Sequence, residues 1–293
     1  MGGLFAVAAK EDCLADLFYG TDYHSHLGTR RGGMVVKNPS GFQRSIHDIT
    51  NTQFRSKFEG DLAKMHGSVG IGVISDTEDQ PLIIGSHLGV YSLATVGRIH
   101  NIEQLAAEAY RGCTTHFSEM SDGEINPTEL VATLINREAS FADGIRRAQE
   151  VIEGSCSLLL LTDEGIYAAR DRLGRTPIIL GSKPGAYAAT METCALPNLG
   201  YKIDRYLGPG EIVRITAEGT EVLQTPGERM QVCSFLWVYY GYPASSYEGI
   251  NVEVSRYRSG AALARADKMP VDLVSGIPDS GTGHALGYAN EAR

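Results

Sequence analysis

Hydrophobic positions in the first third of the chain form short continuous runs and one stretch at helical spacing. Leu14, Leu17 and Phe18 recur every three or four residues, which predicts a helix over residues 11–28 that ends near Gly28. The other runs are small or β-branched and are bounded by glycine and polar residues, as is typical of buried strands. We therefore predict strands at residues 3–8, 32–37, 67–75, 80–86 and 89–97.

Two helices follow, and the first carries a clear start signal. Asn126 is a favourable N-cap, Pro127 suits the first helical position and Glu129 the third, which predicts a helix over residues 126–138. The next amphipathic stretch predicts a helix over residues 141–152. Beyond it, apolar runs separated by the turns "DEG", "KPG" and "AEG" indicate hairpins. These strands are expected at residues 155–162, 166–171, 176–182, 186–191, 210–216 and 220–224.

The order of these elements predicts the fold class and the domain organisation. Strands, then two helices, then strands again favour two sheets covered by helices, an α+β layered domain over residues 1–230. The character changes in residues 231–293, where a helix at 252–267, a buried strand at 271–278 and a last helix are expected. That order is typical of one strand–turn–helix unit of an α/β domain, and the given sequence stops as this domain begins.

Composition and charge narrow the function classes. The chain has 293 residues, of which 43% are hydrophobic and 21% charged, and its net charge is -9. It has no lysine and arginine block, so we expect neither nucleic acid nor a membrane surface as a partner. No apolar run approaches the length of a membrane span, and the first residues do not resemble a signal peptide. Five widely spaced cysteines favour free thiols, and we expect a cytoplasmic protein.

Three short motifs are weak candidates for chemistry. Asp22, His24 and His26 suit a metal by residue type, but residues two apart do not share a helix face, so histidines packed on an amphipathic helix are the better interpretation. The closely spaced glycines of "GSVGIGV" have no following helix and indicate close sheet packing, not a dinucleotide site. Asp163 and Glu164 follow an apolar strand, but another strand comes next, which favours a hairpin turn over a phosphate loop. We predict no metal site.

The most specific part of the sequence lies in residues 233–289. A Cys-Ser pair leads into the aromatic run "FLWVYY", followed by "PAS", "GINV", an arginine-bearing helix, "IPDSG" and "GYA". This order resembles the amidophosphoribosyltransferase family, also called glutamine phosphoribosylpyrophosphate amidotransferases, in which the aromatic run is a strand. Earlier segments are similar too: "ARDRLGRTPIILG", "METCAL" and "LGPGEIVRI". Nearly the whole chain is covered.

The resemblance implies a fold and an activity. It implies that residues 1–230 form a class II glutamine amidotransferase domain, a four-layer αββα sandwich of the N-terminal-nucleophile hydrolase type. Residues 231–293 would be the beginning of an α/β phosphoribosyltransferase-like domain, which is C-terminally incomplete here. The family begins its mature chain with Cys-Gly-x-Phe-Gly, and the thiol attacks the glutamine amide with its own α-amine as base. "GGLFA" aligns with that motif, so Gly2 occupies the position of the nucleophile.

Four further positions of the family's glutamine site are altered. In "SHLGTR", Leu27 replaces an arginine, and Ser75 stands where the family has the arginine that grips the substrate carboxylate. Val96 replaces the asparagine that donates to the oxyanion, although the following Gly97 remains as a candidate substrate-binding residue. Pro127 replaces the aspartate that holds the substrate ammonium. The scaffold therefore matches while the catalytic positions do not, and we expect no catalytic residue.

Three functional hypotheses remain open. The leading one is an amidophosphoribosyltransferase-like protein of purine nucleotide synthesis, a pseudoenzyme whose glutaminase domain is inactive and has a structural or regulatory role. The second is a working glutamine amidotransferase half, and the third is a module that binds another small molecule in the old glutamine pocket. We expect no cofactor, with magnesium needed only by a complete phosphoribosyltransferase domain, and a homo-oligomer at full length. Some family members supply an iron–sulfur ligand where Cys233 stands, but a structural thiol is the simpler interpretation.

Overall fold

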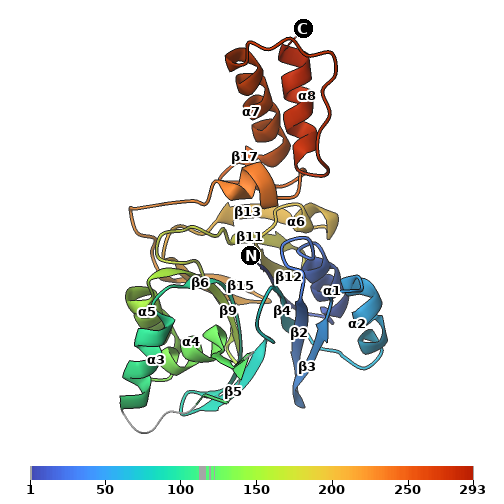
Figure 1. Cartoon of the computed structure of the whole chain (residues 1–293). Coiled ribbons are helices and arrows are strands. Elements are labelled where there is room, and N and C mark those ends of the chain that lie inside the picture. Colours follow the sequence, from blue (N-terminus) through green and yellow to red (C-terminus); the bar gives the residue numbers. More distant parts are fainter. Residues whose placement is uncertain (1, 112–116, 119, 122, 293) are drawn as a thin grey trace. The chain divides into compact units, whose positions relative to one another are not determined.

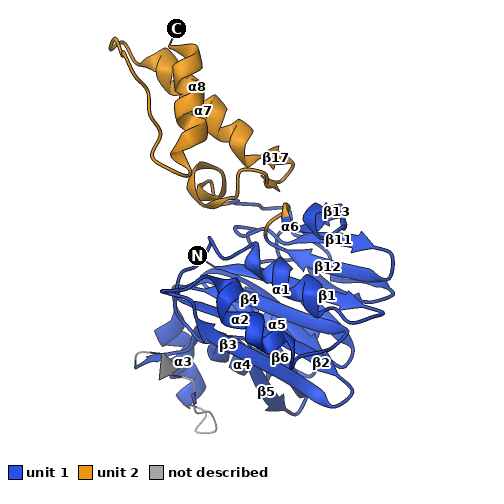
Figure 2. Ribbon diagram, turned by 90° about the vertical axis from the view of Figure 1, so that its right-hand side faces the viewer, with its two compact units in different colours: residues 1–191, 195–232 blue, residues 192–194, 233–293 orange. Residues whose placement is uncertain are grey.

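The protein is described here by a computed structural model that covers residues 2–111, 117–118, 120–121 and 123–292. The chain divides into two compact units (Figure 2). Unit 1 contains residues 1–191 and 195–232, and unit 2 contains residues 192–194 and 233–293. Among the described residues, no helix is both long and apolar enough to cross a membrane.

A seven-stranded sheet forms one half of unit 1 (Figure 1). Its strand order is β13-β11-β12-β1-β4-β2-β3, and every pairing is antiparallel. The first strand of the chain therefore lies at the centre of the sheet, paired on both sides. The strands are β1 (Gly3–Ala9), β2 (Arg31–Asn38), β3 (Gly41–Asp48), β4 (Val69–Ser75), β11 (Ile179–Lys183), β12 (Ala186–Thr190) and β13 (Lys202–Tyr206).

A six-stranded antiparallel sheet forms the other half, in the order β15-β14-β10-β9-β6-β5. Its strands are β5 (Leu82–Ser86), β6 (Gly89–Ile99), β9 (Gly154–Thr162), β10 (Gly165–Ala169), β14 (Ile212–Thr216) and β15 (Gly219–Gln224). A small hairpin, β7 (Met120–Ser121) and β8 (Glu124–Ile125), stands apart. The helices of unit 1 are α1 (Leu14–Asp22), α2 (Phe54–Leu62), α3 (Ile102–Arg111), α4 (Pro127–Ile135), α5 (Phe141–Val151) and α6 (Ala195–Asn198).

Alternation along the strands creates the layers. In β1, Leu4 and Ala6 belong to the core between the two sheets, whereas Phe5 and Val7 face the core beneath α1 and α2. In β9, Leu159 faces the same inter-sheet core, while Leu158 belongs to a third core beneath α4 and α5. The result is helix, sheet, sheet and helix, which confirms the predicted αββα sandwich.

Glycines allow α1 to approach its sheet closely. A Cβ at Gly72 would lie under 3.0 Å from the Thr21 hydroxyl oxygen, and one at Gly70 would lie 2.7 Å from a methyl carbon of Leu17. Because real Cβ contacts are longer, only glycine permits this packing. The structure thus confirms close packing as the purpose of the "GSVGIGV" glycines.

Unit 2 is built around two packed helices, α7 (Val252–Ala266) and α8 (Gly281–Glu291). Before them lie a π-helical turn, η1 (Leu236–Tyr240), and a short hairpin of β16 (Ser246–Tyr247) and β17 (Ile250–Asn251). The buried guanidinium of Arg256 donates hydrogen bonds to the carbonyls of Trp237, Tyr239 and Gly241, which fixes α7 against the turn.

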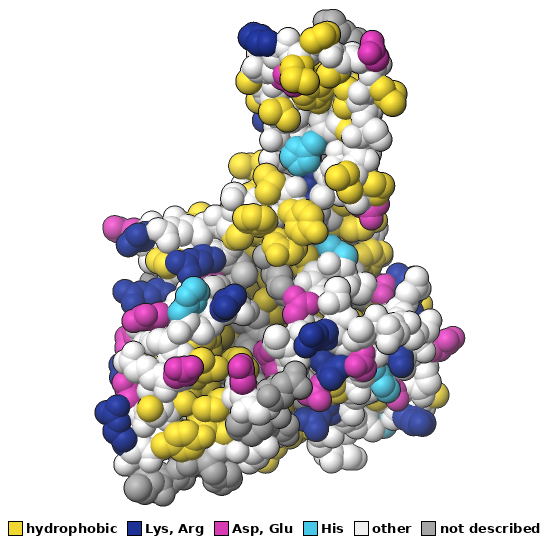
Figure 3. All heavy atoms as spheres, in the orientation of Figure 1, with side chains coloured by type: hydrophobic (Ala, Val, Ile, Leu, Met, Phe, Trp, Pro, Cys, Tyr) yellow, Lys and Arg dark blue, Asp and Glu magenta, His cyan; other side chains and the backbone are white. Residues whose placement is uncertain are grey.

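Most predicted elements are present, and three predictions are wrong. The first helix ends at Asp22, not Gly28. The aromatic run is the π-helical turn η1, because its carbonyls bind Arg256 instead of a neighbouring strand. Residues 271–278 contain no strand, and Leu273 and Ile277 are 86% and 83% exposed. A buried strand needs a sheet to pair with, and the one sheet in the described residues of unit 2 is the short β16–β17 hairpin, which does not pair with this segment (Figure 3 shows exposed hydrophobic side chains).

Candidate functional site

The start of β1 lies between the ends of the two sheets. Gly2 is buried, and Gly3 pairs with Ile74 at the end of β4. A Cβ added to Gly2 would lie under 3.0 Å from the Ile74 carbonyl oxygen and 3.1 Å from Cγ2 of Val96. The position that aligns with the family's nucleophile is therefore in contact with two of the strands that carry the altered residues.

Two more altered positions lie at the same end of β4. Ser75 is the last residue of this strand and is 5% exposed. Its hydroxyl accepts a 3.3 Å hydrogen bond from the Thr77 backbone N–H, so it closes a local turn. Leu27 is buried, and a Cβ at the adjacent Gly28 would be 2.8 Å from Cγ2 of Ile74. Two uncharged side chains, Leu27 and Ser75, are therefore buried at this end of β4.

The end of β6 faces this region from the second sheet. Val96 belongs to the core between the sheets and is 5% exposed. Gly97 pairs with Cys156 of β9, and a Cβ at Gly97 would lie under 3.0 Å from the Ser155 carbonyl oxygen. Close approach of two strands therefore requires glycine at position 97. Its substrate-binding role stays a prediction.

The last altered position begins α4. As predicted, Asn126 caps the helix, with its side-chain oxygen accepting from the backbone N–H groups of Thr128 and Glu129. Pro127 occupies the first helical position and brings neither a side-chain donor nor an acceptor. The hydroxyls of Thr128 and Thr95 lie 2.7 Å apart, which places this helix end beside the residue that precedes Val96.

A buried polar network adjoins these positions, and sequence reasoning missed it. The Gln80 side-chain oxygen accepts from the Thr95 backbone N–H at 2.8 Å and from the Thr128 hydroxyl at 3.2 Å. Its amide nitrogen donates to the Thr95 carbonyl and to Glu78. The network joins residues from three distant parts of the chain, so no local spacing could have revealed it. The polar groups of this network hydrogen-bond to one another, so the network links β6 to the start of α4.

Cys156 is the thiol of this region, but it cannot replace a missing nucleophile. Burial, with a smaller contribution from the nearby carboxylates of Asp171 and Glu78, raises its pKa to about 12. The thiolate is the reactive form, and at neutral pH almost none of it is present. Across the described residues, Cys13, Cys194 and Cys233 likewise form no disulfide, and Cys13 and Cys194 are buried.

The Asp22, His24 and His26 motif does not converge on a metal site. Asp22 forms an ion pair with Arg55, with 2.6 Å between Oδ2 and Nε. The fully buried His24 has Nδ1 2.7 Å from the Gly20 carbonyl, and its Nε2 accepts from the Met191 backbone N–H. His26 is exposed. Within the described ranges, no group of three or more histidine, cysteine or acidic residues could hold a metal.

An αββα sandwich whose first strand begins between the sheet ends is the architecture of the glutamine amidotransferase class, and the comparisons agree. Residues 66–197 match the family described as "Glutamine amidotransferase domain". The amidophosphoribosyltransferase of Archaeoglobus fulgidus is 31% identical over 214 residues, covering 73% of this chain and 46% of the relative. That of Bacillus subtilis is 28% identical over 299 residues, covering 98% of this chain and 61% of the relative.

Solved structures give the same result for the fold. The glutamine phosphoribosylpyrophosphate amidotransferase from B. subtilis, complexed with ADP and GMP, matches with a TM-score of 0.89 and 27% identity, over 99% of this chain and 64% of that one. A structure described as the allosteric regulatory enzyme of purine biosynthesis matches with a TM-score of 0.88. The chain belongs to the amidophosphoribosyltransferase family, and it spans less than two thirds of the length of these relatives.

Proposed function

We propose that unit 1 is a glutamine amidotransferase domain that no longer hydrolyses glutamine. Its role would be structural or regulatory within an amidophosphoribosyltransferase-like protein of purine nucleotide synthesis. The family membership supports the second part of this proposal, and the geometry around Gly2 supports the first.

The observation that carries the proposal is the absence of space at Gly2. The Ile74 carbonyl oxygen occupies the place where any Cβ would project, and Val96 closes a second side. A nucleophile at this position would need both a side chain and room for a glutamine amide beside it. Neither fits the packing between β1, β4 and β6 unless the Ile74 backbone or Val96 shifts.

The other altered positions support the same conclusion. Oxyanion stabilisation needs a donor that points at the reacting oxygen, and Val96 contributes only methyl groups to the inter-sheet core. Ser75 offers no guanidinium fork for a carboxylate, and its hydroxyl already accepts from Thr77. Pro127 has no charge for an ammonium group. Nucleophile, oxyanion donor and both substrate-holding charges are therefore lost together.

The alternative hypotheses have less support. The hypothesis of a working glutaminase half is supported by the family membership alone. The five positions that carry the family's catalytic and substrate-binding groups hold Gly2, Leu27, Ser75, Val96 and Pro127 here. A ligand in the old pocket is disfavoured because Gly2, Leu27, Ser75 and Val96 are all buried in packed surroundings. The lack of a cofactor in this unit, the homo-oligomer and the cytoplasmic location stay predictions.

Glutamate release and glutamine binding test the proposal. We expect the purified chain to release no glutamate from glutamine above a buffer control. Calorimetry should detect no glutamine binding in the micromolar range. The B. subtilis relative, assayed in parallel, shows that the conditions allow detection. Glutamate release that rises with protein concentration and disappears in a Gly2 deletion would overturn the proposal.

A further inference from the structure

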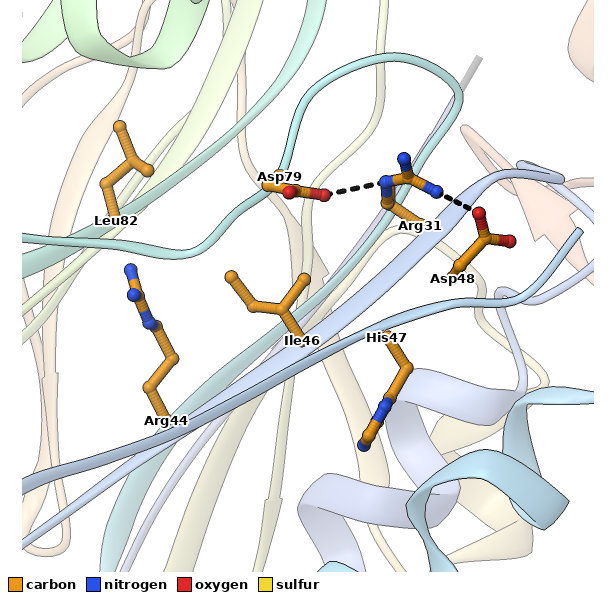
Figure 4. Close-up of a pocket in the computed structure, with 7 residues that line it drawn as sticks. All are labelled: Arg31, Arg44, Ile46, His47, Asp48, Asp79 and Leu82. Atoms are coloured by element: carbon orange, nitrogen blue, oxygen red, sulfur yellow. Dashed lines mark hydrogen bonds and ion pairs between the residues drawn. The ribbon is translucent and has the colours of Figure 1, made fainter. Parts of the chain in front are cut away.

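An open groove of about 400 Å³ lies at one edge of the unit 1 sandwich (Figure 4). It is formed where β3, the edge of the seven-stranded sheet, and β5, the edge of the six-stranded sheet, leave the space between the sheets uncovered. None of the five altered positions lines it. The lining residues are Arg31, Arg44, Ile46, His47, Asp48, Asp79 and Leu82.

One end of the groove is negative. Arg31 lies between two carboxylates, with its Nε 2.7 Å from Asp79 and its Nη1 bonded to Asp48 (dashed lines in Figure 4). Asp48 also accepts a 2.8 Å hydrogen bond from the Thr50 backbone N–H, which fixes its orientation. Two carboxylates share a single guanidinium, so this end keeps an excess of one negative charge.

The other end is positive. Arg44 extends toward Leu82, and its Nη1 donates a 3.2 Å hydrogen bond to the Pro81 carbonyl. Arg44 forms no ion pair with a carboxylate in the part of the chain that the structure describes. A carbonyl oxygen does not neutralise a guanidinium, so Arg44 keeps its charge for another partner.

The two ends are separated by an apolar floor. Arg44, Ile46 and Asp48 alternate along the same face of β3, whereas His47 points toward Asp61 on α2 (Figure 4). Four residues of a strand span about 13 Å, so the opposite charges stand well apart. Ile46 lies between them, and Leu82 approaches from the facing sheet.

We propose that this groove binds a small zwitterion whose anionic and cationic groups stand at opposite ends of a short hydrocarbon spacer. The anion contacts Arg44, the cation contacts the Asp48 and Asp79 pair, and the spacer covers Ile46, while the buried Leu82 lines the groove at the Arg44 end. The volume lies in the usual range for small-molecule sites. The site is independent of glutamine hydrolysis and goes beyond the structural role proposed above.

Charged side chains at a sheet edge can also serve only to prevent pairing with another chain. Protection of the edge does not depend on the distance between the positive and negative side chains, whereas zwitterion binding does. The experiment therefore compares two probes that differ in the distance between their charges. ε-Aminocaproate carries its charges at the two ends of the carbon chain, whereas its isomer norleucine carries both at one end. The two probes have the same atoms and net charge, so a difference between them reports the spacing alone.

The experiment follows the methyl resonances of Ile46 and Leu82 by NMR while each probe is titrated into the intact chain. We expect ε-aminocaproate to shift both resonances with millimolar affinity, as suits an open site with few contacts. Norleucine, caproate and hexylammonium should each bind at least about tenfold more weakly. Equal binding of the two isomers, or no shift with ε-aminocaproate, would overturn the proposal in favour of edge protection.

Two substitutions test the two ends separately. Arg44→Gln and Asp79→Asn should each weaken ε-aminocaproate by about tenfold or more, since each removes one charged contact. Arg172→Gln removes an exposed guanidinium that does not line the groove and should leave the affinity unchanged. All three positions are outside the buried core, and the unchanged remainder of each spectrum verifies folding. Retained affinity in both groove variants contradicts the assignment.

Discussion

Two regions of unit 1 differ in the polarity and burial of their side chains. At the sheet ends around Gly2, the altered positions are buried, and side chains such as Leu27 and Val96 fill the space. At the sandwich edge around Arg44, the side chains are charged and the space is open. The first region lies near the ends of β4 and β6, whereas the second lies along β3, the edge strand of the seven-stranded sheet.

If unit 1 no longer hydrolyses glutamine, as proposed above, the difference shows how a site can lose its chemistry and keep its scaffold. Catalytic groups impose a cost on folding, because charged and polar side chains must be held in poorly solvated places. Leu27 and Val96 avoid this cost, because both are apolar and pack as ordinary core at the sheet ends. The Gln80, Thr95 and Thr128 side chains are polar and buried nearby without the same cost, because they hydrogen-bond to one another.

The largest expected effect comes from breaking that network. Gln80 is 1% exposed, and its amide makes four hydrogen bonds to Thr95, Thr128 and Glu78. Gln80→Leu should lower the free energy of unfolding by about 3–5 kcal/mol, because several buried donors and acceptors lose their partners at once. Urea unfolding measures the change. Gln104→Leu, at an exposed position of α3, is the control and should change stability little. A loss below about 1 kcal/mol in Gln80→Leu would show that the network relaxes or takes up water.

The two longer strands that sequence reasoning missed have a common physical cause. β3 and β13 are the two edges of the seven-stranded sheet, and β13 reads Lys202, Ile203, Asp204, Arg205 and Tyr206. Edge strands carry charged residues that prevent pairing with other chains, so the hydrophobic alternation that reveals central strands is weak. Central strands such as β1 and β9 were predicted because both of their faces are buried.

The candidate site shows a similar limit. The altered positions could be found because a family resemblance fixes their places along the chain. The packing at Gly2 could not, since it depends on a carbonyl of Ile74 and a methyl group of Val96 brought together by tertiary structure. The groove was missed for the same reason: Arg31, Arg44 and Asp79 come from three separate segments.

The second prediction restores the missing thiol. Gly2→Cys, with Met1 shown to be absent by mass spectrometry, should release no glutamate above background. It should also destabilise the fold by about 1–3 kcal/mol, because the new Cβ meets the Ile74 carbonyl oxygen. A coupled glutamate assay and urea unfolding measure the two effects. Gly85→Cys, where an added Cβ has no neighbour within 4 Å, is the matched control for stability.

The quadruple variant Gly2→Cys, Ser75→Arg, Val96→Asn, Pro127→Asp sharpens this comparison. If the single variant is inactive only because the other catalytic and substrate-binding groups are missing, the quadruple variant should gain glutaminase activity. We expect it to stay inactive and to be less stable, because Val96→Asn places an amide without a partner in the inter-sheet core. Glutamate release by Gly2→Cys alone would mean that the site lacks nothing but its thiol.

The smallest expected effect concerns the charged edge. Hydrogen bonds from Thr50 and the Arg31 guanidinium lower the pKa of Asp48 from 3.8 to about 2. Since the folded pKa lies below the unfolded one, the contribution of Asp48 to stability is complete above about pH 4. It is lost as the pH falls from about 4 through the folded pKa of about 2, below which Asp48 is protonated in both states. The melting temperatures of the wild type and Asp48→Asn should therefore differ slightly at neutral pH and converge near pH 2.

Carbon NMR of the Asp48 carboxyl gives the direct measurement, and Thr50→Ala should raise its pKa because the side-chain hydrogen bond from Thr50 is the largest cause of the shift. An Asp48 carboxyl that titrates near 4 in the wild type would mean that the negative end of the groove is not held in place, and the contrast between a packed site and a preorganised edge would then fail at its charged side.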